Sequence, residues 1–254
     1  MKPIIIAAAL VLSPLIHVFG LSRPEADTLT ARGSSAYATG DYVTALDLFD
    51  SVRTAFSSPA LLFNIGNCHF KLNDIAHAIL FYERALRLAP GDEDVKANLE
   101  LVRQNVVDRV NELPSFSLGS TWGRLRGGRD ADQWARRSLG ACLLFFVLLA
   151  AGVLAKQRTL RRTLAGAAGL FMVGTLISVA FASFRHGEVT DDSAAIILAP
   201  KVDVRSEPRE STTVLFVLHK GTKVTVLQVK NGWSEVQLAN GSVGWAPPTT
   251  LERI

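Results

Sequence analysis

The chain has 254 residues but only two cysteines and five histidines. Cys68 falls in a predicted soluble helix and Cys142 in an apolar run, so we expect no disulfide framework. The histidines are scattered, and none is paired in sequence with a cysteine or a carboxylate at metal-ligand spacing. A glycine-rich phosphate-binding loop is also missing. These absences predict a protein with no metal site, no cofactor and no catalytic activity.

The net charge of +4, with a pI near 9.3, is unevenly distributed. Arginines crowd around two apolar runs, first at Arg124, Arg126, Arg129, Arg136 and Arg137 and then in a short connector. Lipid headgroups explain this clustering better than nucleic acid does, so no nucleic-acid partner is expected.

Two uncharged apolar segments, residues 138–155 and 163–184, lie close together near the middle of the chain. As a helix the first would be about 27 Å long, close to the hydrocarbon thickness of a bilayer. The connector between them, residues 156–162, is basic and has no acid, which places it in the cytoplasm by the positive-inside tendency. We therefore predict a two-helix transmembrane hairpin; two core helices of a soluble protein are the alternative.

Residues 1–20 begin with Lys2, continue as an apolar run and end in a small residue, which is typical of a secretory signal peptide, cleaved or retained as an anchor. This predicts the bacterial inner (cytoplasmic) membrane, with both flanking domains on the periplasmic side. Arg136 and Arg137 at the outer end of the first span argue against that orientation. The inverted topology, with both domains in the cytoplasm, therefore stays open.

Residues 26–111 have a helical period, and residues 59–92 resemble a tetratricopeptide repeat. The positions that carry the resemblance are Leu62, Ile65, Gly66, Phe70, Ala78, Tyr82, Ala85 and Pro90. An earlier copy begins at Ala26, and Asp92 can cap a third, terminating helix. Because fewer than three repeats are marginal alone, we expect this domain to lean on a partner, a second copy or the membrane.

The resemblance implies binding of proteins or peptides along the concave face of the repeats. In peptide-clamping members of the family, asparagine and lysine on the first helix of each repeat grip a carboxylate. Asn67 stands at the matching asparagine position, with Asn64 and Lys71 one turn to either side. Thr30 and Ser34 depart from this pattern in the first copy, which argues against a C-terminal carboxylate clamp. A merely solvated helix face is the alternative.

Residues 112–137 form a predicted linker with interfacial aromatic residues, and after the second span the period changes to two. In residues 190–254, the pairs Asn231-Gly232 and Asn240-Gly241 each predict a type I′ hairpin. The residues predicted to form the core of a small closed barrel are Val224, Val226, Val229, Val236, Leu238 and Trp245.

This segment resembles a bacterial SH3-like (SH3b) domain. The resemblance is carried by residues 202–208, 219–227, 231–238 and 239–254. It implies binding of cell-wall peptides or of other proteins. Trp233 is the expected exposed aromatic residue, with Arg205 and Glu207 near the same surface, whereas Trp245 is predicted to lie in the core.

The order of the parts indicates a multidomain membrane protein with an all-α tetratricopeptide repeat domain, a transmembrane hairpin and an all-β SH3-like barrel. This order, with DEDVKANLELVRQ after the last repeat and LPSF before Trp122, resembles the BatE family of bacterial aerotolerance operons. The resemblance implies a membrane complex with von Willebrand A-domain proteins and a MoxR-type AAA ATPase, linked to oxidative-stress tolerance or envelope maintenance.

We therefore expect a non-enzymatic membrane-anchored scaffold. The alternatives are a peptidoglycan-binding envelope receptor and an auxiliary subunit of a cell-wall enzyme.

Overall fold

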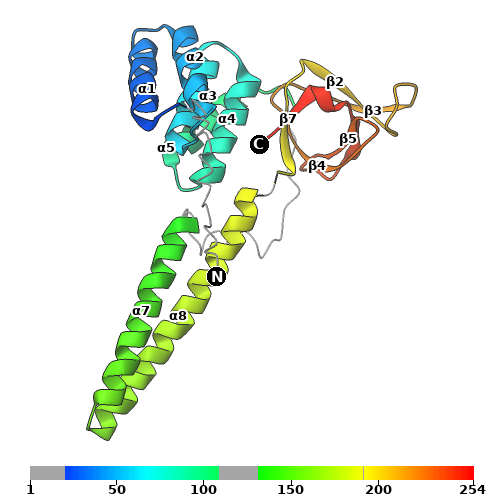
Figure 1. The fold of residues 1–254 in the computed structure, drawn as a ribbon. Coiled ribbons are helices and arrows are strands. Elements are labelled where there is room, and N and C mark those ends of the chain that lie inside the picture. The colour runs from blue at the N-terminus through cyan, green and yellow to red at the C-terminus, as the bar shows by residue number, and fades with distance from the viewer. Residues whose placement is uncertain (1–20, 109–130, 191) are drawn as a thin grey trace, which may run out of the picture.

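The computed structural model describes residues 21–108, 131–190 and 192–254 (Figure 1). They form a helical domain, a long helical hairpin and an antiparallel sheet, in that order along the chain. The predicted signal peptide, residues 1–20, and residues 112–130 of the predicted linker lie outside the described residues.

Five helices make up the helical domain: α1 (Arg23–Ala38), α2 (Tyr42–Arg53), α3 (Pro59–Lys71), α4 (Ile75–Leu88) and α5 (Glu93–Arg103). The caps are encoded locally, since Asp41, Ser58, Asp74 and Asp92 each accept a hydrogen bond from a backbone N–H in the first turn of the helix that follows. The predicted cap of the terminating helix at Asp92 is thereby confirmed.

The two helical pairs, α1–α2 and α3–α4, are built alike. The turn after α1 uses Gly40 at φ 87°, and the turn after α3 uses Asn73 at φ 62°. Both are left-handed positions, where glycine and asparagine are favoured. The residue that follows each of them caps the next helix, so one helix–turn–helix pattern occurs twice.

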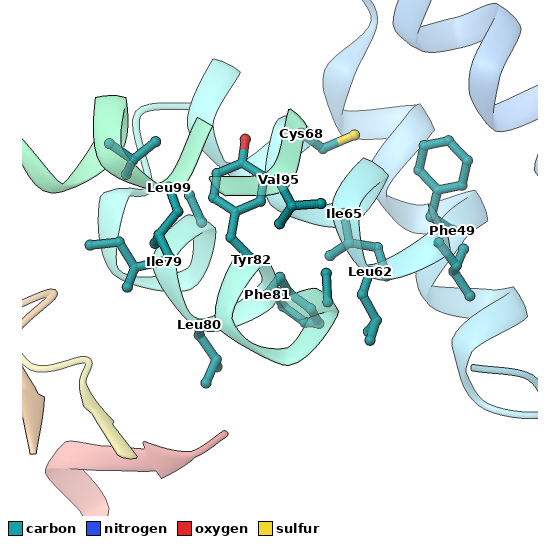
Figure 2. Close-up of a cluster of buried hydrophobic side chains, with 14 of the residues drawn as sticks. Phe49, Leu62, Ile65, Cys68, Ile79, Leu80, Phe81, Tyr82, Val95 and Leu99 are labelled. Atoms are coloured by element: carbon teal, nitrogen blue, oxygen red, sulfur yellow. The ribbon is translucent and has the colours of Figure 1, made fainter. Parts of the chain in front are cut away.

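Small residues let the paired helices approach closely. A Cβ atom added to Gly66 would lie 2.7 Å from two ring carbons of Tyr82, and one added to Gly33 would lie 2.7 Å from the ring of Phe49. Tyr82 is fully buried and Phe49 is 1% exposed (Figure 2). Gly66, one of the positions that carry the repeat resemblance, is therefore needed for the close packing of α3 on α4.

The hairpin consists of α7 (Ala131–Leu154) and α8 (Arg158–Thr190), which run side by side over most of their length (Figure 1). Each contains a segment long and apolar enough to cross a membrane, Gln133–Leu154 and Arg158–Phe184. Very little of either segment is buried within the structure. Trp134, in residues that the sequence analysis assigned to the linker, lies on α7 with its ring centroid 4.8 Å from that of Phe181 on α8.

Seven strands form one antiparallel sheet: β1 (Ala194–Ile197), β2 (Lys201–Arg205), β3 (Val214–His219), β4 (Lys223–Lys230), β5 (Trp233–Gln237), β6 (Val243–Ala246) and β7 (Leu251–Arg253). A 3₁₀ turn, η1 (Pro248–Thr250), precedes β7. The order is β3-β2-β6-β5-β4-β1-β7. The prediction of a closed barrel is therefore wrong: β3 and β7 are edges, and the three-residue β7 pairs only with β1.

Of the two predicted type I′ turns, one is confirmed. Asn231 and Gly232 have φ of 51° and 79°, and their neighbours Lys230 and Trp233 pair across the hairpin. The second prediction is wrong, because only Gly241 has a positive φ there. The amide of Leu238 bonds the carbonyl of Ser242, which gives a longer loop of the kind that ends in a left-handed glycine.

The sheet core contains the predicted Val224, Val226, Val236 and Leu238, and Trp245 is 8% exposed. Val229 was also predicted in this core but is 55% exposed. The strand register shifts between Val226 and Gln228. Every residue of β4 after Val226 is exposed, so the contribution of this strand to the core ends before Val229.

Candidate binding surfaces

The sheet domain packs against the helical domain through α4, and we call this contact the docking interface (Figure 1). Ile196, on β1, is fully buried in the hydrophobic cluster of the helical domain, and Leu198 and Ile254 pack against the same cluster. Leu80 of α4 is fully buried and belongs to the same cluster. Its side chain and the hydroxyl of Tyr82 point to opposite sides of the picture in Figure 2. The helical and sheet domains therefore share apolar packing.

Close approach at this interface depends on a glycine. Gly221 has φ 90°, and a Cβ atom there would lie 3.0 Å from Val106 and 3.2 Å from Ile79. Both the left-handed backbone and the narrow space favour glycine at this position.

Glu83, an α4 residue only 8% exposed, is the central charged group of the docking interface. Its Oε2 accepts a hydrogen bond from the Nζ atom of Lys223 at 2.8 Å, and its Oε1 accepts one from the guanidinium of Arg103. One carboxylate thus joins α4, α5 and β4, and two cations compensate the burial of its charge.

Asp108 makes a second polar contact between the helical and sheet domains. Its carboxylate accepts hydrogen bonds from the backbone amide of His219 at 2.6 Å and from the hydroxyl of Thr222 at 2.7 Å, and its Oδ1 lies 2.8 Å from the His219 Nδ1. Burial tends to raise the pKa of Asp108, but these hydrogen bonds outweigh it and hold the pKa below its ordinary value.

The last residues of the described chain complete the docking interface. Arg84 forms an ion pair with Glu252 at 2.8 Å, and Arg87 donates a hydrogen bond to the carbonyl of Ile254. The sequence analysis expected the short repeat array to lean on a partner, a second copy or the membrane, and did not consider the sheet domain, which packs on α4.

The three predicted residues of the repeat surface all lie on α3, away from the α4 contacts of the docking interface. Lys71 is exposed, and Asn64 and Asn67 are half-buried. The Oδ1 of Asn67 accepts a 2.6 Å hydrogen bond from the buried hydroxyl of Tyr82. Asn67 therefore orients Tyr82, a packing role that was not predicted from the sequence. Asn64 and Lys71 remain accessible to solvent and are the residues of the predicted surface that a partner can reach.

On the sheet domain, Arg205 and Trp233 line one shallow depression of about 420 Å³. Charged residues of both signs, Lys201, Asp203 and Glu210, also line it. The guanidinium of Arg205 donates a 2.8 Å hydrogen bond to the carbonyl of Thr212, which fixes this side chain against the loop after β2.

The third predicted residue of the SH3b surface, Glu207, does not line this depression. It is exposed and forms an ion pair with Arg209 at 2.6 Å. The structure thus brings Arg205 and Trp233 together, and Asp203 and Glu210 supply the acidic groups.

Two of the chain's histidines meet at the turn between α3 and α4. The Oδ2 atom of Asp74 lies 3.2 Å from Nδ1 of His69 and 2.7 Å from Nδ1 of His77. The expectation that no histidine pairs with a carboxylate at metal-ligand spacing is therefore wrong, because the turn brings together residues that are eight apart in sequence. These three residues are called the His–Asp cluster below.

The charges within the His–Asp cluster support one another. Burial tends to raise the pKa of Asp74, but the hydrogen bonds from His69 and His77 outweigh it and hold the pKa far below its ordinary value. The hydrogen bond to Asp74 raises the pKa of His77. Cys68, next to His69 in sequence, is a free buried thiol whose pKa burial raises to about 11, so it is a poor nucleophile.

Comparison with protein families matches two of these parts. Residues 59–92 match the tetratricopeptide repeat family, and residues 200–252 match the bacterial SH3 domain family. No curated protein matches the chain. The predicted domain content, a tetratricopeptide repeat and a bacterial SH3 domain, is confirmed.

Proposed function

We propose that this chain is a non-enzymatic, membrane-anchored scaffold that binds protein partners through its tetratricopeptide repeats and its SH3b domain. The observation that carries the proposal is the docking interface. It joins two families of binding module through α4, and its contacts involve neither Asn64 and Lys71 of the α3 surface nor Arg205 and Trp233 of the SH3b depression. A partner that reaches both surfaces gains from their fixed spacing, because the second contact forms within an existing complex.

The apolar hairpin supports membrane anchoring. Helices of a soluble core would be mostly buried, whereas only 6% and 11% of the apolar windows of α7 and α8 are buried. Such an exposed apolar surface is unstable in water and stable among lipid tails. In our proposal the basic connector, residues 156–162, lies in the cytoplasm and both binding domains lie on the periplasmic side of the inner membrane.

The resemblance to the BatE family gives this scaffold its proposed partners. These are von Willebrand A-domain proteins and a MoxR-type AAA ATPase, in a complex for aerotolerance or envelope maintenance. The α3 surface, with Asn64 and Lys71, is the proposed contact for one of them.

The test is a comparison of partners recovered with the full chain after crosslinking in cells and purification in mild detergent. We expect the wild-type chain to recover A-domain proteins and the ATPase, and the double variant Asn64→Ala, Lys71→Glu to lose them. Arg32→Glu is the matched control, because it makes the same charge change at an exposed position on α1. Equal recovery by all three chains would show that α3 is not the binding surface.

A second candidate function, peptidoglycan binding by an envelope receptor, is favoured by the depression that Arg205 and Trp233 share. An aromatic ring can pack against the apolar part of a peptide side chain, and the neighbouring charged groups can pair with its charged ends. In this case the full chain would be retained on purified sacculi, and Trp233→Leu would reduce retention while Glu207→Gln, outside the depression, would not. Recovery of a wall hydrolase in the crosslinking experiment would instead favour an auxiliary subunit of a cell-wall enzyme.

A further inference from the structure

We propose that His69, Asp74 and His77 form a binding site for one late first-row divalent cation, for which Zn²⁺ is the natural probe. The three residues come from both helices of the second repeat: His69 from the end of α3, Asp74 from the cap of α4 and His77 from its first turn. The site is independent of the scaffold proposal.

The donor set suits such a cation. Two imidazole nitrogens and one carboxylate oxygen are common ligands of Zn²⁺ and of its late first-row neighbours. One ligand atom from each residue lies within 4.8 Å of the other two. In a tetrahedral zinc site with bonds near 2.0 Å, ligand atoms are roughly 3.3 Å apart. A movement of at most about 1.5 Å, which the half-exposed side chains of Asp74 and His77 can make, is therefore enough to form the site.

The carboxylate of Asp74 can serve the cation without giving up its structural role. Oδ1 accepts the capping hydrogen bond from the backbone amide of His77, whereas Oδ2 faces both imidazoles. One oxygen of Asp74 therefore caps α4, and the other is available to bind the cation.

The imidazoles are also held in place by stacking. The ring of His69 lies between the rings of His77 and Phe81, with centroid distances of 5.0 Å and 5.4 Å. The side chain of His69 is 13% exposed and that of His77 is 36% exposed, so the cluster opens to solvent on one side. Water, or a side chain of a partner, would fill the remaining coordination positions.

Protons compete with the cation for the histidines, because only the neutral imidazole is a ligand. The charged groups that act on His77 are Asp74, Glu252 of β7 and Arg84 of α4. Both acids stabilise the protonated ring and the arginine opposes it. Since an imidazole ordinarily titrates near pH 6.5, binding of the cation should strengthen as the pH rises from about 6 to about 8.

A bound cation would tie the end of α3 to the start of α4. Because it would bind the folded repeat and not the separated helices, it should raise the melting temperature of the repeat domain. That stabilisation is a second readout, separate from the binding measurement.

The experiment is a calorimetric titration of Zn²⁺ into the full chain, purified in detergent without a histidine tag and freed of metal by a chelator. We expect one ion per chain, and Co²⁺ in its place should give the visible absorption of a nitrogen- and oxygen-ligated site. His69→Gln, His77→Gln and Asp74→Asn should each weaken binding about tenfold or more. Asn is as good a helix cap as Asp, so the third variant removes a charged ligand and keeps α4.

His219→Gln is the matched control, because this histidine also contacts an aspartate, Asp108, but is not in the His–Asp cluster. It should leave Zn²⁺ affinity unchanged. Protection of the buried Cys68 thiol from a labelling reagent would show that each variant keeps the folded repeat. Absence of Zn²⁺ binding by the wild-type chain, or equal affinity in all the variants, would overturn the proposal.

Discussion

Replacing Gly66 by alanine should destabilise the repeat domain, although alanine is the better helix former. The new Cβ atom would lie 2.7 Å from two ring carbons of Tyr82, well inside van der Waals contact. The ring cannot easily move, because Tyr82 is fully buried and its hydroxyl donates a hydrogen bond to Asn67. The α3–α4 contact must therefore open or strain.

The size of the effect follows from two opposing contributions. Helix propensity favours alanine over glycine by about 1 kcal/mol inside a helix. Overpacking of a well-filled core costs about 1–3 kcal/mol. The ring of Tyr82 is buried and its hydroxyl is hydrogen-bonded, so we expect a cost near the upper end of this range. The clash is the larger contribution, so we expect a net loss of about 2 kcal/mol in the free energy of unfolding.

The chain offers a specific assay, because the thiol of Cys68 is fully buried in the core of the repeat domain. Urea unfolding followed by reaction of this thiol with a labelling reagent, in a Cys142→Ser background, therefore reports on that domain. In the background Tyr82→Leu, which makes room, the loss on Gly66→Ala should shrink or reverse. If Gly66→Ala instead raised the stability by the propensity gain alone, the close approach of α3 and α4 would be refuted.

Three further predictions concern the docking interface, a turn and the pH dependence. Lys223→Met should lower the stability of the sheet domain by about 1 kcal/mol in urea unfolding followed by tryptophan fluorescence, because Glu83 loses a charge-assisted hydrogen bond from a half-exposed amine. Gly232→Ala should cost about 1–2 kcal/mol in the same assay, because an L-residue at φ 79° is strained. The hydrogen bond to Asp74 raises the pKa of His77, so this pair contributes stability below pH of about 6.5 that is lost as the pH rises through the folded pKa. His77→Gln should therefore flatten the fall in repeat stability from pH 6 to pH 8, measured by urea titration; an unchanged slope would contradict the linkage.

Local features of this fold could be predicted because they depend on neighbours in sequence. Gly66 and Tyr82 belong to one repeat pattern, Asp92 precedes an apolar helix, and Asn231-Gly232 separates two alternating strands. In each case the sequence itself supplies the packing partner, the capped amide or the left-handed turn. The structure contains all three features.

Contacts between distant segments were not predictable in the same way. Glu83 and Arg84 look in sequence like surface residues of an amphipathic helix, yet they bond to Lys223 and Glu252 of the sheet domain. In the structure Glu83 is only 8% exposed, with cations from α5 and from the sheet domain on its two oxygens. The exposure of Val229 was likewise not predictable, because the apolar pattern of β4 continues beyond Val226, where the strand has no further buried residue.

The His–Asp cluster is an intermediate case. His69 and His77 lie on different helices, which suggested that they are apart. An antiparallel pair joined by a tight turn brings the end of one helix beside the start of the next, and an aspartate at the cap lies between them. A histidine five residues before a capping Asp74 and another three residues after it was therefore the feature to notice.

The docking of the SH3b domain on α4 is tested most directly by a zero-length carbodiimide crosslink, which joins a carboxylate to an amine only when they are in contact. Glu83 and Lys223 lie 2.8 Å apart, and the pair Glu93 and Lys96 within α5, 2.7 Å apart, serves as the positive control. We expect mass spectrometry of the full chain to find a Glu83–Lys223 crosslinked peptide, which is lost in Lys223→Arg. A Glu93–Lys96 crosslink without the Glu83–Lys223 peptide would contradict the docked arrangement and the scaffold built on it.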